Sequence, residues 1–353
     1  MSIVDTLTEI TQSGASDIFI VAGLPLTHKI NGQMRTREET KLMPQQTAEM
    51  ITAIYQLAED RDMTRLLTTG DDDFSFAIKG VARYRISAYK QRGSFSAVIR
   101  VITFSIPKPE DLGIPENIIQ FSDKKKGLVL ITGPAGSGKS TTLACMIDHI
   151  NSTRQSHIIT LEDPLEYLHM HKKSIVSQRE VVTDTESYLT ALRASLRQSP
   201  DVILLGEMRD YETMNVAMTA AETGHLILST LHTIGASNTI DRIIDAFPPN
   251  QQHQIAIQLS MVLQAVVSQQ LIPTKDGGIV PVFEIMTLTP AIRNMIRESK
   301  VHQIDGMIYS SAADDMIAMD TSLLNLFKSG RISEKTALTY ATNADLLAKK
   351  MKM

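Results

Sequence analysis

The segment GPAGSGKSTT, residues 133–142, has the residue types and spacing of a loop that binds phosphate. Glycines let the backbone curl so that several N–H groups point at one anion, and the positive end of a following helix adds to the attraction. The ammonium of Lys139 would reach the terminal phosphates of a nucleotide, and the hydroxyl of Ser140 would bind Mg²⁺. The predicted nucleotide-binding residues are Gly133, Pro134, Ala135, Gly136, Ser137, Gly138, Lys139, Ser140 and Thr141.

The sequence on both sides of this loop favours the same interpretation. The apolar run LVLIT, residues 128–132, predicts a strand directly before it. Leu143, Met146, Ile147 and Ile150 follow at helical spacing. A glycine-rich turn with no ligand is the alternative, but the strand–loop–helix context is the one that a phosphate loop requires. We therefore predict that the chain binds a nucleotide.

Hydrolysis of a bound nucleotide needs a carboxylate near Mg²⁺ and a group that orients the attacking water. Two acidic clusters follow predicted strands: Glu162 and Asp163 in TLEDPLEY, and Glu207 in VILLGEMRD. Carboxyl ends of parallel strands meet at one edge of a sheet, so both clusters can converge on the loop. A strand that ends in Asp is the usual Mg²⁺ pattern, whereas here Gly206 precedes Glu207. Either cluster could also be a solvated strand end.

Two histidines, His225 and His232, flank a third apolar strand in HLILSTLHT. A histidine after a strand can donate a hydrogen bond to a phosphate oxygen, or it can cap a turn. Because the pair brackets one strand beside a nucleotide site, the two roles carry about equal weight.

The chain predicts a two-domain α/β protein. Residues 1–105 contain a short strand in SDIFIVAG, a hairpin turn at Asn31-Gly32, a helix in QQTAEMITAIYQLAED, and three strands with turns at Lys79-Gly80 and Arg92-Gly93. From about residue 124, strands at 128–132, 157–161, 202–206 and 226–230 alternate with amphipathic helices, which indicates a parallel sheet covered on both faces. We predict a proline-containing linker at 106–123 and a mostly helical tail from about 250.

Composition limits the class of protein. The net charge of −4 argues against a protein that coats nucleic acid. The single cysteine, Cys145, fits a reducing compartment, where we expect it to be a small core residue. Neither a signal peptide nor a run of about 18 apolar residues is apparent. We therefore expect a cytoplasmic protein that reaches the membrane through a partner.

Four segments together resemble the signature boxes of the type II/type IV secretion ATPase superfamily: GPAGSGKSTT, ITLEDPLEYLH, LRQSPDVILLGEMRD and AAETGHLILSTLHT. The resemblance runs nearly end to end. Within the superfamily the chain is similar to the PilT-type pilus retraction ATPases, which power twitching motility. One cysteine excludes the four-cysteine zinc module common in extension and secretion ATPases, and AIRNMIRE, residues 291–298, resembles a motif of the retraction type.

The resemblance implies a hexameric ring whose subunits each have a PAS-like N-terminal domain and a RecA-like ATPase domain at 124–353. By motif position, Glu162 would polarise the attacking water, Glu207 would support Mg²⁺, and His225 and His232 would form a histidine box. The implied partners are an inner-membrane platform protein of the pilus and an accessory retraction paralogue. Direct contact with nucleic acid and insertion in the membrane are not expected.

The resemblance also suggests a role for the basic strands between Phe74 and Arg100, which contain six cationic residues and no acidic one. Arg83 and Arg85 are two residues apart, so they share a face of one strand. In a ring, Arg83, Arg85 or Arg100 could act as an arginine finger on bound ATP. A solvated sheet surface, or one that faces nucleic acid, is the alternative.

Two other functions use the same sequence features. A motor for pilus extension, secretion or DNA uptake would have the same ATPase boxes. A DNA translocase would explain the basic strands, although a chain with no tryptophan, 5% aromatic residues and a negative net charge lacks stacking platforms and a broad basic surface.

Overall fold

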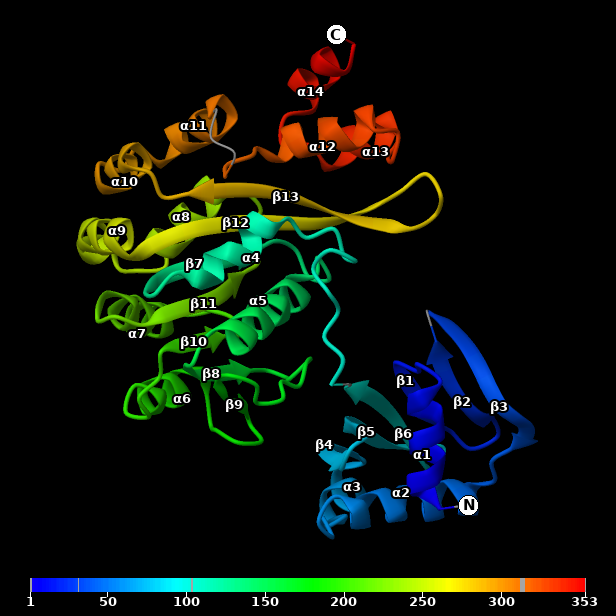
Figure 1. Cartoon of the computed structure of the whole chain (residues 1–353). Helices are drawn as coiled ribbons and strands as arrows, with labels where there is room; N and C mark the ends of the chain where they lie inside the picture. The colour runs from blue at the N-terminus through cyan, green and yellow to red at the C-terminus, as the bar shows by residue number, and fades with distance from the viewer. Residues whose placement is uncertain (1, 31, 103, 312–314, 353) are drawn as a thin grey trace. The chain divides into compact units, whose positions relative to one another are not determined.

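The computed structural model describes residues 2–30, 32–102, 104–311 and 315–352. The chain divides into two compact units (Figure 1). One is Met1–Ser105 with Glu166–Leu168, and the other is Ile106–Leu165 with His169–Met353.

The first unit is an antiparallel sheet of six strands in the order β3-β2-β1-β6-β5-β4. Its strands are β1 (Asp17–Ile20), β2 (Pro25–Ile30), β3 (Gln33–Lys41), β4 (Asp71–Ile78), β5 (Ala82–Gln91) and β6 (Ser94–Ile102). Its helices are α1 (Ile3–Gln12), α2 (Pro44–Leu57) and α3 (Thr64–Thr69). The turns predicted at Lys79-Gly80 and Arg92-Gly93 join β4 to β5 and β5 to β6. The turn predicted at Asn31-Gly32 includes Asn31, which lies outside the described residues.

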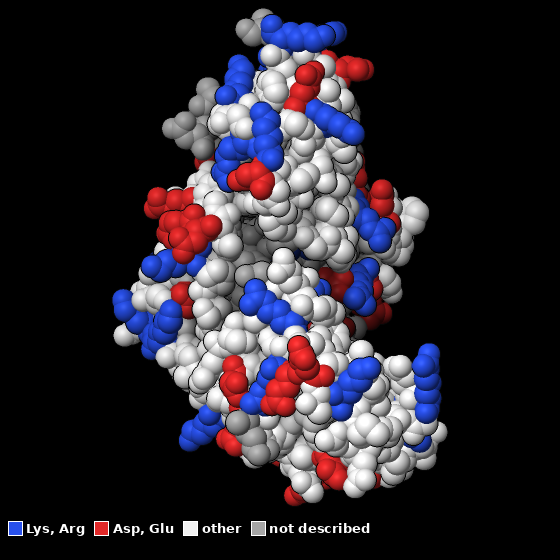
Figure 2. Space-filling model, turned by 90° about the vertical axis from the view of Figure 1, so that its right-hand side faces the viewer, with Lys and Arg blue, Asp and Glu red and all other residues white. Residues whose placement is uncertain are grey.

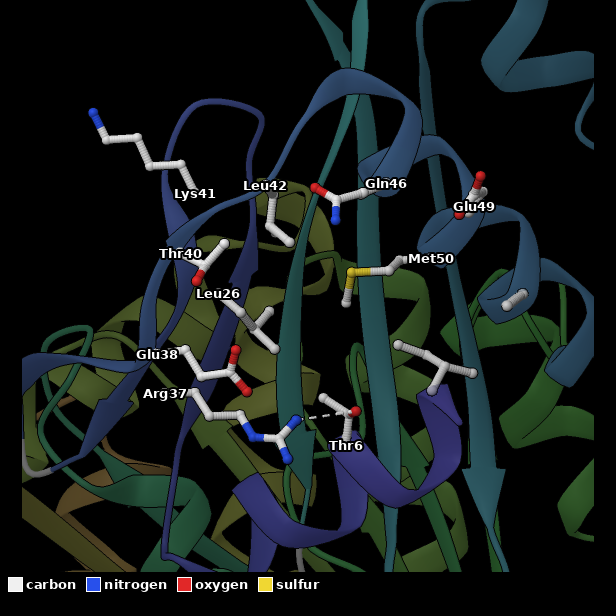
Figure 3. Close-up of a pocket in the computed structure, with 12 residues that line it drawn as sticks. Thr6, Leu26, Arg37, Glu38, Thr40, Lys41, Leu42, Gln46, Glu49 and Met50 are labelled. Atoms are coloured by element: carbon white, nitrogen blue, oxygen red, sulfur yellow. Dashed lines mark hydrogen bonds between the residues drawn. The ribbon is translucent and has the colours of Figure 1, made fainter. Parts of the chain in front are cut away.

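An open cavity of about 360 Å³ lies in this unit, among residues of α1, α2, β2 and β3 (Figure 3). Leu26, Met50 and other apolar side chains line it together with charged ones. Arg37 stands at its edge, where Nη1 donates to Thr6 Oγ1 over 3.2 Å and Nη2 pairs with Glu9 at 2.6 Å. The residues that line this cavity include none of the predicted site residues.

A buried carboxylate fixes the start of β4 in the first unit. Asp72 is 1% exposed and accepts hydrogen bonds from Tyr55 Oη at 2.9 Å and from Arg61 Nε and Nη2, both at 3.0 Å. Burial alone would raise the pKa of Asp72, but the hydrogen bonds from Arg61 and Tyr55 outweigh it, and the net pKa is lowered. The ionised carboxylate therefore stabilises the fold.

We expect Asp72→Asn to cost about 2–3 kcal/mol of unfolding free energy at pH 7, because charge-assisted hydrogen bonds to a buried group are lost. A group whose folded pKa is lowered stabilises above its unfolded pKa of about 3.9 and stops doing so as pH falls through the folded value. The stability difference between wild type and variant should therefore shrink below about pH 4. Urea unfolding of the full chain at pH 7 and pH 3 measures it. Asp73→Asn, an exposed neighbour on the same strand, is the control; equal costs for both variants would contradict the prediction.

The second unit is a sheet of seven strands in the order β13-β12-β7-β11-β10-β8-β9, parallel except for β13. Its strands are β7 (Gly127–Thr132), β8 (His157–Glu162), β9 (Ile175–Glu180), β10 (Val202–Leu205), β11 (Leu226–Leu231), β12 (Leu263–Pro273) and β13 (Ile279–Thr287). Its α-helices are α4 (Glu116–Gln120), α5 (Lys139–Thr153), α6 (Tyr188–Ser195), α7 (Tyr211–Glu222), α8 (Ala236–Asp245), α9 (Pro249–Val262), α10 (Pro290–Arg297), α11 (Ile304–Ser310), α12 (Met319–Lys328), α13 (Glu334–Tyr340) and α14 (Ala344–Met351). Two short 3₁₀ helices span Phe121–Asp123 and Val301–Gln303.

Side chains of the central strands alternate between two cores, as the period of two along a strand requires. In β7, Leu128 and Leu130 pack with residues of α7 and α9, whereas Val129 and Ile131 pack with residues of α4 and α5 (Figure 1). Every residue of β7 and of β11 is buried. The predicted parallel sheet covered on both faces is confirmed, and Cys145 is a core residue, 2% exposed, whose thiol pKa burial raises to about 11.

The prediction of a mostly helical tail from about residue 250 is wrong for residues 263–287. The run LQAVVSQQLIP is strand β12, which pairs with β7 on one side and β13 on the other. Both of its faces are covered, so it has no alternation of polar and apolar residues. Ser268 and Gln269 are buried because they hydrogen-bond to neighbouring loops and helices. These buried polar residues made the strand resemble an amphipathic helix.

The predicted linker, residues 106–123, is also more ordered than its prolines suggest. Ile114, Ile118, Ile119 and Phe121 are buried in the second unit against α5 and β7. The spacing of these apolar residues, rather than the prolines, decides the structure of the segment, because α4 and the 3₁₀ helix bury one face. The whole segment from residue 106 to 123 therefore belongs to the second unit.

Candidate nucleotide site

The phosphate-loop residues lie where the sequence predicts, between the end of β7 and the start of α5. Gly138 caps α5 with φ of 88°, a left-handed conformation that suits glycine, and Lys139 is the first helical residue. Lys139 is buried, and its Nζ donates to the carbonyl oxygens of Gly133 and Pro134, each at 2.8 Å. The ammonium is therefore held inside the loop, at the positive end of the helix.

Strand β12 lies directly against this loop. Gly133 has φ of 138°, and a Cβ at this position would overlap the carbonyl oxygen of Gln269. The side chain of Gln269 accepts a hydrogen bond from Thr142 Oγ1 at 2.8 Å, one turn into α5. The loop is thus shaped both by its own glycines and by a strand more than a hundred residues later, which sequence reasoning missed.

The predicted acidic residues lie at the carboxyl ends of their strands. These strand ends are at the same edge of the sheet as the phosphate loop. The pairing of Leu205 with Leu161, and of Leu231 with Thr132, brings these strand ends to similar levels. In the order β7-β11-β10-β8, His232 follows the strand next to β7, Glu207 lies just after the second, and Glu162 is the last residue of the third. With strands about 4.8 Å apart, the backbone of Glu162 lies about 14 Å from β7 and that of Glu207 about 10 Å. Asp163 follows Glu162 and is exposed.

Glu207, Arg209 and His232 form the polar centre of this edge. Arg209 Nη2 pairs with Glu207 Oε1 at 2.5 Å, and His232 Nε2 lies 3.4 Å from Glu207 Oε2. The hydrogen bond from Arg209 is the largest cause that lowers the pKa of Glu207, so the carboxylate is ionised at neutral pH. Arg209 is another functional candidate that sequence reasoning missed, although it lies in the quoted box VILLGEMRD.

The structure separates the two histidines of the predicted histidine box within one chain. His225 precedes β11 and His232 follows it, so six strand residues lie between them, a span of about 20 Å. His225 Nδ1 instead lies 2.9 Å from the Ala220 carbonyl at the end of α7. The two histidines flank the strand as the sequence predicts, and of the two His232 shares the loop's edge of the sheet; the role of His225 in a histidine box stays a prediction.

The three arginines proposed as fingers lie in the first unit, Arg83 and Arg85 on β5 and Arg100 on β6. Arg85 is directly opposite Arg100, and Asp17 on β1 is opposite Arg100 on its other side. Arg100 Nε donates to Asp17 Oδ1 over 3.1 Å, which offsets the repulsion between the two cations. Their finger role stays a prediction, because it depends on the placement of one unit relative to the other.

A mainly apolar cavity of about 200 Å³ opens beside the loop. Thr141 and Thr142 from α5 line it, together with Leu112, Leu271 and Pro281. Such a cavity suits a flat, mostly apolar group of a ligand whose phosphates are held by the loop. No local pattern in the sequence predicts this cavity, since its walls come from three distant segments.

Comparison with known proteins agrees with this geometry. The family model described as type II/IV secretion system protein matches residues 1–280. The chain is 44% identical to the Pseudomonas aeruginosa protein named "Type IV pilus retractation ATPase PilT", over 96% of this chain and 97% of that protein. It is 40% identical to the type IV pilus ATPase PilU of the same organism, over 97% of this chain and 89% of that protein. A crystal structure of the pilus retraction motor PilT with bound ADP matches with a TM-score of 0.90 and 43% identity, over 99% of both chains.

The fold and the loop together define a P-loop ATPase with a RecA-like domain preceded by a smaller α+β domain. This chain belongs to the type II/IV secretion system protein family. Within the described part of the chain, none of the helices combines the length and apolar character that crossing a membrane would require.

Proposed function

We propose that this chain is the ATP-hydrolysing motor that retracts type IV pili and so drives twitching motility. The observation that carries the proposal is its similarity to PilT, 44% identity over nearly the full length of both proteins. The nucleotide loop, the acidic strand ends and His232 supply the parts that such a motor needs at one edge of one sheet.

The residues present fit ATP with Mg²⁺. The loop and Lys139 would hold the phosphates, and the cavity beside Thr141 would take the base. Hydroxyl and carboxylate oxygens are the ligands that Mg²⁺ prefers, and Ser140 with the ionised Glu207 would supply them. Bound Mg²⁺ would neutralise charge on the phosphates. Glu162 would orient and polarise the water that attacks in line with the leaving group.

The working assembly in this proposal is a homohexameric ring. At least one of Arg83, Arg85 and Arg100 would contact the ATP of a neighbouring subunit, and the segment near Ile106 would be the hinge between the two units. The ring would act at the cytoplasmic face of the inner membrane, on a pilus platform protein, with a PilU-like paralogue as a possible accessory.

The alternative functions are motors with the same ATPase site that act on other substrates. Pilus extension, secretion and DNA uptake are outcomes that the experiment below can distinguish. A DNA translocase needs a broad basic surface. On the described residues of the face in Figure 2, Lys and Arg are interspersed with Asp and Glu, and no continuous basic stripe is visible.

The test is a count of surface pili on the native host carrying Lys139→Ala. Losing the loop's ammonium should stop the motor, so pili should accumulate while surface motility is lost. Lys173→Ala, an exposed lysine outside the loop, is the control and should leave both unchanged. Fewer pili would indicate an assembly motor. An unchanged pilus count would redirect the assignment to secretion or DNA transport.

A further inference from the structure

Tyr188, the first residue of α6, lies where β8 and β10 end. Its ring packs with the core on one side of the sheet. Its hydroxyl lies against Gly206: a Cβ on Gly206 would be 2.8 Å from Tyr188 Oη, 3.1 Å from the Leu161 carbonyl and 3.4 Å from Glu162 Cα. The hydroxyl therefore lies beside the ends of β8 and β10, close to the backbone of Glu162 and of Gly206, which precedes Glu207. The absence of a side chain at Gly206 leaves space for it.

The surroundings make this hydroxyl a donor. Burial is the largest cause that raises the pKa of Tyr188, and the carboxylates of Glu207, Asp163 and Glu162 raise it further, opposed by Arg209. The phenol thus stays protonated in the combined field of three carboxylates.

The hydroxyl makes no hydrogen bond to any residue that the structure describes. Tyr188 is only partly buried and its hydroxyl reaches solvent at this edge of the sheet, so it can donate to a site group that comes within reach. Glu207 directly follows Gly206 in the chain, and in this structure its oxygens face Arg209 and His232.

We propose that Tyr188 is a positioning residue of the ATPase site, whose hydroxyl donates a hydrogen bond to the Glu207 carboxylate during turnover and fixes its orientation toward the phosphate loop. The inference rests on the proposed role of Glu207 in ATP hydrolysis. Binding of ATP itself is left to the loop, from which Tyr188 is separated by two strands, β11 and β10.

Tyr188→Phe tests the proposal in the full-length protein, by steady-state ATP hydrolysis between pH 5 and pH 9. We expect kcat to fall about 10-fold, with the KM for ATP and the melting temperature nearly unchanged. A hydrogen bond to an ionised carboxylate lowers its pKa, so its loss should move the acid limb of kcat to higher pH. The charged or titratable groups that interact with Glu207 in the described residues are Arg209, His232 and Tyr188, and Tyr188 is in turn influenced by Glu162 and Asp163.

Tyr211→Phe is the matched control. Tyr211 is likewise the first residue of a helix, α7, and its hydroxyl lies 3.5 Å from exposed Glu212. It should leave kcat and the pH profile unchanged. Gly206→Ala places a methyl group 2.8 Å from the hydroxyl oxygen, so it should reduce kcat in the wild type and reduce it less in the Tyr188→Phe background.

A Tyr188→Phe protein with wild-type kcat and acid limb would overturn the inference, as would a loss of kcat that follows a loss of thermal stability without a change in the pH profile. Fully additive effects of Tyr188→Phe and Gly206→Ala would also overturn it. Failure of the proposed function is a separate result: the wild type would then show no ATP hydrolysis that depends on Lys139.

Discussion

Purified protein with Glu162→Gln is expected to hydrolyse ATP about 100- to 10,000-fold more slowly than the wild type, which is the range that a catalytic carboxylate contributes. The amide keeps the size and shape of the side chain but cannot polarise water as a carboxylate does. Nucleotide affinity should stay within about twofold, since the loop and Lys139 are unchanged. Single-turnover hydrolysis, with binding of a fluorescent ATP analogue measured separately, tests both parts.

The neighbouring carboxylate supplies the control. Asp163 is exposed, whereas Glu162 is partly buried at the end of β8. Asp163→Asn should retain most of the activity. If Asp163→Asn is inactive and Glu162→Gln is active, the catalytic assignment moves by one residue; if both are active, Glu207 becomes the candidate for orienting water.

The second large effect concerns the arginines of β5 and β6. If one of Arg83, Arg85 and Arg100 is a finger, its alanine variant should lose about 10³- to 10⁵-fold in kcat, because the guanidinium stabilises charge that develops on the transferred phosphoryl group. Arg100 is bound to Asp17, which makes it a weaker candidate than Arg85, the residue opposite it on β5. Lys79→Ala, at the turn between β4 and β5, is the control for loss of a cation from this sheet.

Mixing subunits tests whether the finger acts between neighbours. Lys139→Ala subunits have intact arginines, and Arg83→Ala subunits have an intact loop. Rings reconstituted from both should recover part of the activity that each lacks alone. Loss of kcat without recovery on mixing would assign the arginine to its own subunit's site, and unchanged kcat in all three single variants would end the finger hypothesis.

Local patterns predicted the loop, the central strands and the helix after the loop, because each is specified by adjacent residues. The buried run LVLIT can be only a covered strand or a core helix, and the glycines that follow it decide between them. The strand ends also placed Glu162, Glu207 and His232 on one edge, since parallel strands share a direction.

Features that depend on distant pairing were not predictable. Gln269 is polar, yet it is buried because Thr142 hydrogen-bonds to it, and no local pattern indicates that contact. Arg209 can be recognised as a site residue only when its distance to Glu207 is known. Tyr188 can be recognised as one only when its hydroxyl is found next to Gly206. His225 and His232 were correctly placed at opposite ends of one strand, but whether both act in a histidine box depends on contacts that the sequence of one chain does not specify.

The position of β12 between β7 and β13 has a consequence for the smallest part of the chain that can fold as an ATPase. All the motifs that carry the chemistry end by residue 232, so a truncation soon after α9 would retain every one of them. Such a fragment would leave β7, a strand buried along its whole length, as an unpaired edge open to aggregation. The catalytic motifs and the autonomous folding unit therefore have different boundaries, and the second extends at least through Thr287.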